Sequence, residues 1–278
     1  MFLYPLALGI LSTFSPFLGL ILAMVYCARN LGPAIVSPQR ALTAFFLLPA
    51  IIMLFDNSTS SLMVGMDAVF GVGFIAYIFL ISLRRNQILT ESFLIGTLML
   101  SLYGMLRMKL FGGYITQSFE EGMRIIQNQI PALTQGEYFA DSMAMWQYVL
   151  PAMWVVGQIL ALLIGFILLH RIIGIPFRAG DMRFPPLFNL VIIAILPLYL
   201  IPDTRVLFVN LLLSLCMIPL IQGCCYVSVW ISRVIASKTI RNIIMVILVI
   251  YAFIPLTLIG FADLWLGNRK ILHTGEKA

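Results

Sequence analysis

Long apolar runs separated by short charged turns dominate this chain. Of its 278 residues, 62% are hydrophobic and only 10% are charged. A bilayer core of roughly 30 Å needs about 20 apolar residues for each helical crossing. Lipid offers no water to backbone N–H and C=O groups, so such runs must form helices or closed barrels, and the alternation typical of barrel strands is absent. The sequence therefore predicts an all-α, polytopic integral membrane protein.

The apolar runs also predict the number of crossings, which we take to be about eight. Pro16 is placed to divide the first run and two other runs are short, so seven or nine crossings are also compatible with the pattern. We expect one transmembrane domain over residues 1–278, with residues 110–147 as an extramembrane insert between the fourth and fifth helices. The eight runs are 3–28, 41–55, 62–83, 88–108, 148–170, 187–201, 206–231 and 242–266.

Basic residues predict the orientation, because Arg and Lys are retained in short cytoplasmic loops. They gather in alternate loops, near positions 29–40, 84–85, 171–183 and 233–241, and eight crossings would put all four loops in the cytoplasm and both termini outside. Arg269, Lys270 and Lys277 in the C-terminal tail oppose this assignment. The loops account for the net charge of +6, so we expect no nucleic-acid partner.

The insert at 110–147 has an amphipathic pattern. Gly112 and Gly113 are expected to break the preceding helix, Ser118 and Glu121 have the spacing of a capping box, and the helix should end near Pro131. A second short amphipathic segment follows over 137–146. The pattern favours a pair of interfacial helices lying on the bilayer. A lid over a site that opens outward is the alternative.

Two of the runs, 41–55 and 187–201, are short and contain Pro49 and Pro197. Short or interrupted helices in matching positions of two halves are typical of a binding site at the bilayer midplane. Helix tilt or local thinning of the bilayer explains the same lengths. Both interpretations stay open.

Polar residues inside apolar runs are the candidates for function, because each is costly in hydrocarbon unless it faces the bundle or water. Asp67 is the most informative of them. Its carboxylate is suited to hold a cationic group or relay a proton, whereas the nearby Asp56 and serines favour a place at the outer interface. Amides in such runs are mostly interhelical hydrogen bonders. The ligand-binding candidates are Asp67, Gln158, Asn189, Asn210 and Gln222.

Catalytic motifs are absent from the sequence. It contains no HExxH, GxSxG or phosphate-binding loop, and its two histidines and four cysteines match no metal-site spacing. We therefore expect no enzyme activity, no catalytic residues, no metal and no cofactor. Small residues repeat at steps of four in the seventh run, which favours close packing against a helix of this chain or of a partner subunit. These packing candidates are Gly223, Cys224, Ser228, Ser232 and Ala236.

Three short strings carry a family resemblance: 178–186 (RAGDMRFPP), 220–223 (LIQG) and 259–265 (IGFADLW), with Arg269 and Lys270 after the last. In order and spacing they resemble the YybS-like predicted bacterial membrane proteins, a family of unknown function, and the resemblance covers essentially the whole chain. It implies a multi-pass protein of the bacterial inner membrane. The positions that match are Arg178, Arg183, Phe184, Pro185, Gln222, Gly223, Asp263, Trp265 and Arg269.

The YybS-like family is similar in turn to the substrate-binding S components of energy-coupling-factor vitamin importers. The resemblance implies a transport-type component that binds a small molecule within the bundle and docks on partner subunits. A structural or assembly subunit of a membrane complex is the alternative. Physically, Asp263, Trp265 and Arg269 are expected to form an interfacial clamp near the end of the last helix.

Overall fold

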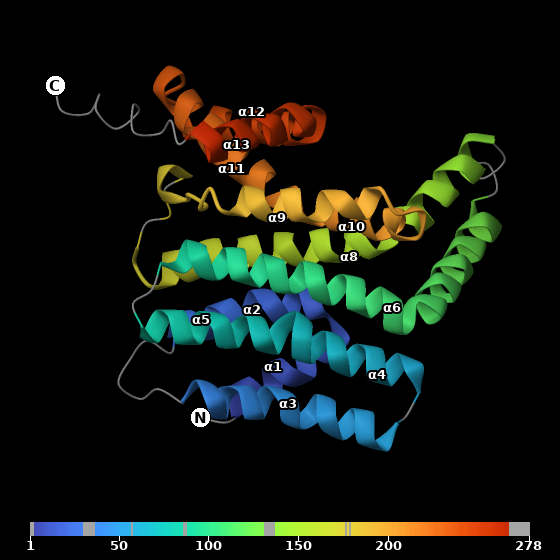
Figure 1. The fold of residues 1–278 in the computed structure, drawn as a ribbon. Coiled ribbons are helices and arrows are strands. Elements are labelled where there is room, and N and C mark those ends of the chain that lie inside the picture. Colours follow the sequence, from blue (N-terminus) through green and yellow to red (C-terminus); the bar gives the residue numbers. More distant parts are fainter. Residues whose placement is uncertain are drawn as a thin grey trace.

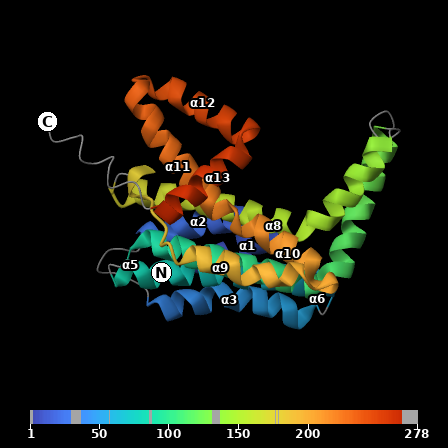
Figure 2. The ribbon, with the colours of Figure 1, turned by 45° about the horizontal axis from the view of Figure 1, so that its top comes forward.

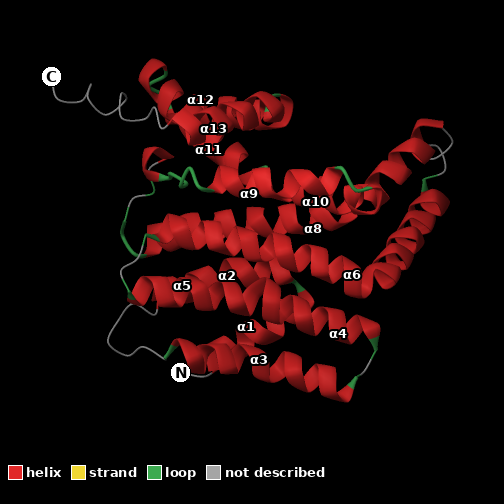
Figure 3. Ribbon diagram, in the orientation of Figure 1, coloured by secondary structure: helices red, strands yellow, loops and turns green. Residues whose placement is uncertain are grey.

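Every element of the described chain is a helix (Figure 3). The computed structural model describes residues 3–29, 37–56, 58–85, 88–130, 137–175, 177 and 179–266. Four stretches are long and apolar enough to cross a bilayer, or five if one bent helix pair forms a single span. The predicted all-α class is therefore confirmed, and the long apolar helices are compatible with a membrane protein, but the count of eight crossings is not supported. The four stretches are Thr59–Arg84, Leu89–Gln129, Ser142–Ile172 and Pro202–Val234.

Two runs that were counted as crossings fold back on themselves. Helices α1 (Leu3–Phe14) and α2 (Pro16–Arg29) part at Ser15, and a Cβ added to Gly19 would lie 2.9 Å from the Cα of Ser12. In a straight helix, residues seven apart are separated by about 10 Å. Pro16 lacks an N–H and suits the first position of a new helix, which places the break.

The C-terminal run is broken in the same way. Helices α12 (Lys238–Tyr251) and α13 (Phe253–Leu266) meet at an angle of 100°. Both outer ends of this pair point to one end of the molecule in Figures 1 and 2. The run 242–266 is therefore a bent pair instead of a straight rod.

Two further runs give short helices. Helix α9 (Phe188–Ile195) passes into the 3-10 turn η3 (Leu196–Tyr199), where Pro197 prevents the α-helix from continuing. Helix α3 (Pro38–Phe55) keeps Pro49 inside it. The short turns η2 (Ala179–Asp181) and η4 (Pro202–Thr204) precede α9 and α10, and α10 (Arg205–Leu215) with α11 (Met217–Val234) makes the last long stretch.

The long helices lie side by side in one bundle (Figure 1). Helix α3, the segment formed by α4 (Thr59–Met66), η1 (Asp67–Gly73) and α5 (Phe74–Arg84), and then α6 (Leu89–Gln129), α8 (Glu137–Ile172) and α9–α10 follow one another across it. Fully buried Leu20, Met24, Phe79, Phe93 and Phe166 form the core between α2, α5, α6 and α8. The helix ends at Arg29, Arg84 and Lys238 lie at one end of the bundle, as the basic loops predicted.

Helix α6 does not break at the glycine pair. It stays helical for 41 residues through Gly112 and Gly113, so the predicted helix end there and the capping box at Ser118 are both wrong, although the helix changes direction where it leaves the bundle (Figures 1 and 2). It ends at Gln129, close to the predicted end at Pro131. Residues 110–129 leave the bundle beside residues 142–147 of α8, and we call these two segments the arm (Figures 1 and 2). The arm is held by a hydrogen bond of 3.3 Å from Gln147 to Glu120.

Asp56 lies in the short connection between the end of α3 and the start of α4. Its carboxylate accepts hydrogen bonds from the Ser61 hydroxyl and the Ser58 N–H, which hold the pKa of Asp56 below its usual value of 3.8. Because the pKa of Asp56 is lower in the folded than in the unfolded state, its ionised carboxylate stabilises the fold at pH values above the unfolded-state pKa. This stabilisation is lost as the pH falls through the folded-state pKa.

Asn210 replaces a hydrogen bond at a proline kink. Pro151 lies inside α8, where its ring disfavours regular helix geometry. Asn210 of α10 accepts from the Ala152 N–H and donates to the Tyr148 C=O, both at 2.9 Å, so its amide is inserted between two groups that would pair in a straight helix. It also donates to the Val206 C=O at 2.9 Å.

We expect Asn210→Leu to lower the free energy of unfolding by about 1–3 kcal/mol, because it leaves the buried Ala152 N–H without an acceptor. Adding Pro151→Ala should restore part of this loss, since the Ala152 N–H can then return to the Tyr148 C=O. Asn128→Leu, at an exposed site of the arm, is the matched control and should change stability by less than about 0.5 kcal/mol. Equal losses at positions 128 and 210 in thermal unfolding would contradict this role.

Candidate functional site

A π-helical turn places the candidate carboxylate Asp67. In η1 the N–H of Phe74 donates to the C=O of Val69, five residues earlier, instead of to the residue four earlier. Such turns are rare inside α-helices and are frequent at functional sites. Asp67 begins this turn and is only 3% exposed. The carboxylate therefore lies inside the bundle and not at its outer interface.

Two side chains of α6 hold this carboxylate. The Tyr103 hydroxyl donates to Oδ1 of Asp67 at 2.7 Å, and Nε of Arg107 donates to Oδ1 and Oδ2 at 2.8 and 3.1 Å. Tyr103 and Arg107 are one turn apart, so they share the face of α6 that meets η1. Asp67 and Arg107 thus form an ion pair that is nearly excluded from solvent, with side-chain exposures of 5% and 12%.

Aromatic rings surround the ion pair. The guanidinium carbon of Arg107 lies 4.8 Å from the ring centroid of Trp154 on α8, a cation–π contact. Tyr103 packs edge-on against Trp154 and stacks on Phe70 of η1. These rings exclude water from the pair and orient the guanidinium.

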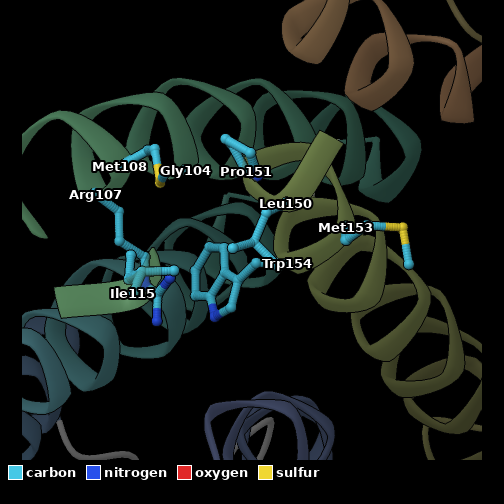
Figure 4. Close-up of a pocket in the computed structure, with 8 residues that line it drawn as sticks. All are labelled: Gly104, Arg107, Met108, Ile115, Leu150, Pro151, Met153 and Trp154. Carbon is cyan, nitrogen blue, oxygen red and sulfur yellow. The ribbon is translucent and has the colours of Figure 1, made fainter. Parts of the chain in front are cut away.

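A cavity of about 360 Å³ opens beside Arg107, at the foot of the arm where α6 and α8 diverge. Figure 4 shows the Arg107 and Trp154 side chains next to each other at this cavity. Gly104 allows the close approach of α8, because a Cβ there would overlap Val155. Apart from Arg107 the lining is apolar: Gly104, Met108, Ile115, Leu150, Pro151, Met153 and Trp154.

A second, shallower cavity of about 630 Å³ lies between η3 and α10. Its lining is Ile193, Leu196, Pro197, Tyr199, Leu200 and Phe208, with no charged side chain. An apolar depression on the flank of a membrane bundle needs no ligand other than lipid. Of these two cavities, the one at Arg107 combines an apolar wall with a placed polar group, as ligand sites do.

The structure separates the remaining ligand-binding candidates from Asp67. Gln158, on α8 and one turn beyond Trp154, is fully buried, and neither amide atom has a hydrogen-bond partner among the described residues. Asn189 is 7% exposed at the start of α9. Asn210 is fully engaged by the backbone of α8 and α10, as described above. Only Asp67 contributes to the ion pair beside the cavity.

Residues of the family motifs gather at a different place. Gln222 of α11 donates to Asp263 of α13 and accepts from the Phe184 N–H at 3.4 Å. One residue along, Gly223 and Gly260 cross so closely that a Cβ on either would overlap backbone atoms of the other helix. The two hydrogen bonds of Gln222 thus join α11 to α13 and to the loop before α9. Of the other motif positions, Arg183 and Trp265 are exposed, Pro185 is partly buried, and Arg178 and Arg269 lie outside the described residues.

The stripe of small residues on α11 is only partly a packing surface within the chain. Gly223 is buried against α13, Cys224 and Ser228 are partly buried, and Ser232 is exposed. Ala236 is also exposed, but it lies beyond the end of α11 at Val234, so it does not continue the stripe. The close helix approach was thus predicted correctly at Gly223. Its main partner, Gly260, was not singled out for packing.

Sequence reasoning missed Arg107, Tyr103 and Trp154. Arg107 falls at the end of the fourth apolar run, where it reads as a boundary residue. A basic residue near the end of one run, with an acidic residue inside a neighbouring run, is the signal that could have paired it with Asp67. Among the described residues, no three His, Cys, Asp or Glu side chains come together as metal ligands.

Comparison of the chain with protein-family models, with curated proteins and with solved structures finds no match. The candidate site therefore stands on its geometry alone.

Proposed function

We propose that this chain is a non-enzymatic, transport-type membrane component that binds a small molecule in the cavity beside Arg107. The observation that carries the proposal is a buried Asp67–Arg107 pair at the wall of a cavity of about 360 Å³. Ligand sites are apolar cavities of about 300–1,000 Å³ with a few placed polar groups. Charged residues inside membrane bundles mark substrate pathways by default.

The likeness to YybS-like proteins, and through them to S components, supports the same function. Three of the motif positions lie at the contact between α11 and α13, where Gln222 donates to Asp263 and Gly223 crosses Gly260. The motifs would then maintain the scaffold, and the cavity would bind the ligand.

The arginine-rich end of the bundle is assigned to the cytoplasm of a bacterial inner membrane, following the positive-inside rule. Arg29, Arg84 and Lys238 lie at this end, and the arm and the cavity lie toward the other. The ligand would therefore enter from outside the cell.

An assembly subunit is the second candidate, and α12 favours it. No residue of α12 is buried, and Ile243, Val246 and Ile250 are each more than half exposed. Figure 2 shows α12 standing apart from the bundle, connected through α11 and α13. Such an apolar helix would be covered by lipid or by a partner membrane protein.

Native mass spectrometry of the detergent-extracted protein separates the two functions. The transport-type function predicts a bound mass of a few hundred daltons on the wild-type chain, and its loss in the Asp67→Asn/Arg107→Gln double variant. A protein subunit retained by both forms, with no small adduct on either, would refute ligand binding and favour assembly.

A further inference from the structure

The hydrogen bonding of Arg107 leaves it with donors facing the cavity. A guanidinium has five N–H donors. Nε is used on Asp67, and Nη2 contacts the Met63 sulfur at 3.4 Å, a weak acceptor. Among the described residues the Nη groups have no oxygen acceptor, although Arg107 lines the cavity. The planar fork of Arg matches carboxylate and phosphate groups in particular.

Charge balance decides what can bind there. Asp67 already neutralises Arg107, so an anion that joins the pair would leave one uncompensated negative charge in a poorly solvated site. A proton on the Asp67 carboxyl would remove that excess, and the neutral acid could still accept the Tyr103 hydrogen bond. Binding of one anion would then leave the net charge of the site unchanged.

Few other titratable groups can supply the compensating charge. Tyr103 and Arg107 are the described titratable side chains that bond to Asp67. The helices packed against η1 run from α1 to α6, and among the described residues none of their other titratable side chains is hydrogen-bonded to Asp67. These side chains are Tyr4, Tyr26, Cys27, Arg29, Arg40, Tyr77 and Arg84, with Glu91, Lys109, Tyr114, Glu120, Glu121 and Arg124 of α6.

We propose that the cavity takes up a small amphipathic monoanion, a carboxylate or phosphate on an apolar body, together with one proton that binds to Asp67. The anionic group accepts from the Nη groups of Arg107, and the apolar body lies against Leu150, Pro151 and Trp154. This inference rests on the proposed function and adds the ligand class and its coupling to protons.

Benzoate is a suitable probe and benzamide is its neutral isostere. Binding to the purified protein in phosphatidylcholine nanodiscs would be measured by calorimetry at several pH values, in two buffers of different ionisation enthalpy. We expect benzoate to bind the wild type with uptake of about one proton. The Kd for benzoate should then rise by up to tenfold for each unit by which the pH is raised. The Asp67→Asn variant should bind benzoate without proton uptake or pH dependence.

The Asp67→Asn/Arg107→Gln double variant should not bind benzoate. It removes both charges at once, so it keeps the site neutral and folded where a single Arg107 variant could fail to fold. Nanodiscs with anionic phosphatidylglycerol distinguish the source of the anion. If a lipid headgroup occupies the site, these discs stabilise the wild type but not the double variant, and they compete with benzoate.

Benzoate binding to the wild type without proton uptake would overturn the inference, as would equal binding by the double variant or no benzoate binding at any pH. Binding of benzamide alone would also overturn it, but would leave the proposed function intact with a neutral ligand. Loss of every small-molecule adduct from the native protein would instead refute the proposed function.

Discussion

Replacing Arg107 with Gln is expected to lower the free energy of unfolding by about 3–5 kcal/mol, because it leaves the buried Asp67 carboxylate without its counter-charge. The loss includes the two hydrogen bonds from Nε and the contact with Trp154. Thermal or denaturant unfolding in detergent would measure it.

Restoring neutrality should recover most of this stability. The Asp67→Asn/Arg107→Gln double variant is expected to unfold at a free energy closer to the wild type than either single variant does. Arg124→Gln, on the exposed arm of the same helix, is the control and should change stability by less than about 0.5 kcal/mol. Additive losses from positions 67 and 107 would show that the two side chains do not interact.

Adding one methyl group at Gly260 or Gly223 is expected to cost about 3 kcal/mol, the upper end of the overpacking range. A Cβ at Gly260 would overlap the Pro219 carbonyl, and one at Gly223 would overlap the Leu256 carbonyl. Both obstacles are backbone atoms, which cannot rotate away as a side chain can. Helix α13 would have to move from α11, and Gln222 would lose its contact with Asp263.

Gly113→Ala and Gly122→Ala are the matched controls, because a Cβ at either site meets nothing within 4 Å. Alanine is the better helix former by about 1 kcal/mol, so these changes should stabilise the protein or leave it unchanged. Opposite signs for the two glycine pairs in the same unfolding assay are the expected result. Destabilisation by all four substitutions alike would remove the special role of the α11–α13 crossing.

The apolar runs predicted which residues are helical and failed to predict where the helices turn. The runs at 3–28 and 242–266 have the composition of a crossing, yet they reverse or bend at Ser15 and Ala252. The free energy of transferring apolar side chains into lipid depends on the amount of apolar surface and hardly on the direction of the helix that carries them. The contact of Ser12 with Gly19, which fixes one reversal, is a tertiary feature that no window of hydropathy contains.

The glycines of α6 show the opposite error. Gly112 and Gly113 lower helix propensity by about 1 kcal/mol each, but the helix continues through both to reach the arm. Packing of residues 110–129 against the N-terminal part of α8 accompanies this continuation, with Glu120 and Gln147 bonded across it. The low helix propensity of these two glycines therefore did not predict the end of the helix, because the segment could pack against a neighbouring helix.

The candidate site was half predictable. Asp67 stood out because a carboxylate in an apolar run demands a partner. The pairing with Arg107 was missed, since Arg107 lies 40 positions away and its distance from Asp67 depends on how η1 and α6 pack. The cavity has no sequence signature either, because the divergence of α6 and α8 at the arm creates it.

Site-directed cysteine labelling tests most directly whether the arginine-rich ends share one face of the membrane. In a variant without the four native cysteines, single cysteines would replace Ser58, Arg84 and Lys238, all of which are exposed. With a membrane-impermeant maleimide on intact cells, we expect position 58 to react, and positions 84 and 238 to react only after the membrane is opened. Labelling of positions 84 and 238 from opposite faces, or of 58 and 84 from the same face, would contradict the arrangement and the outward-facing cavity with it.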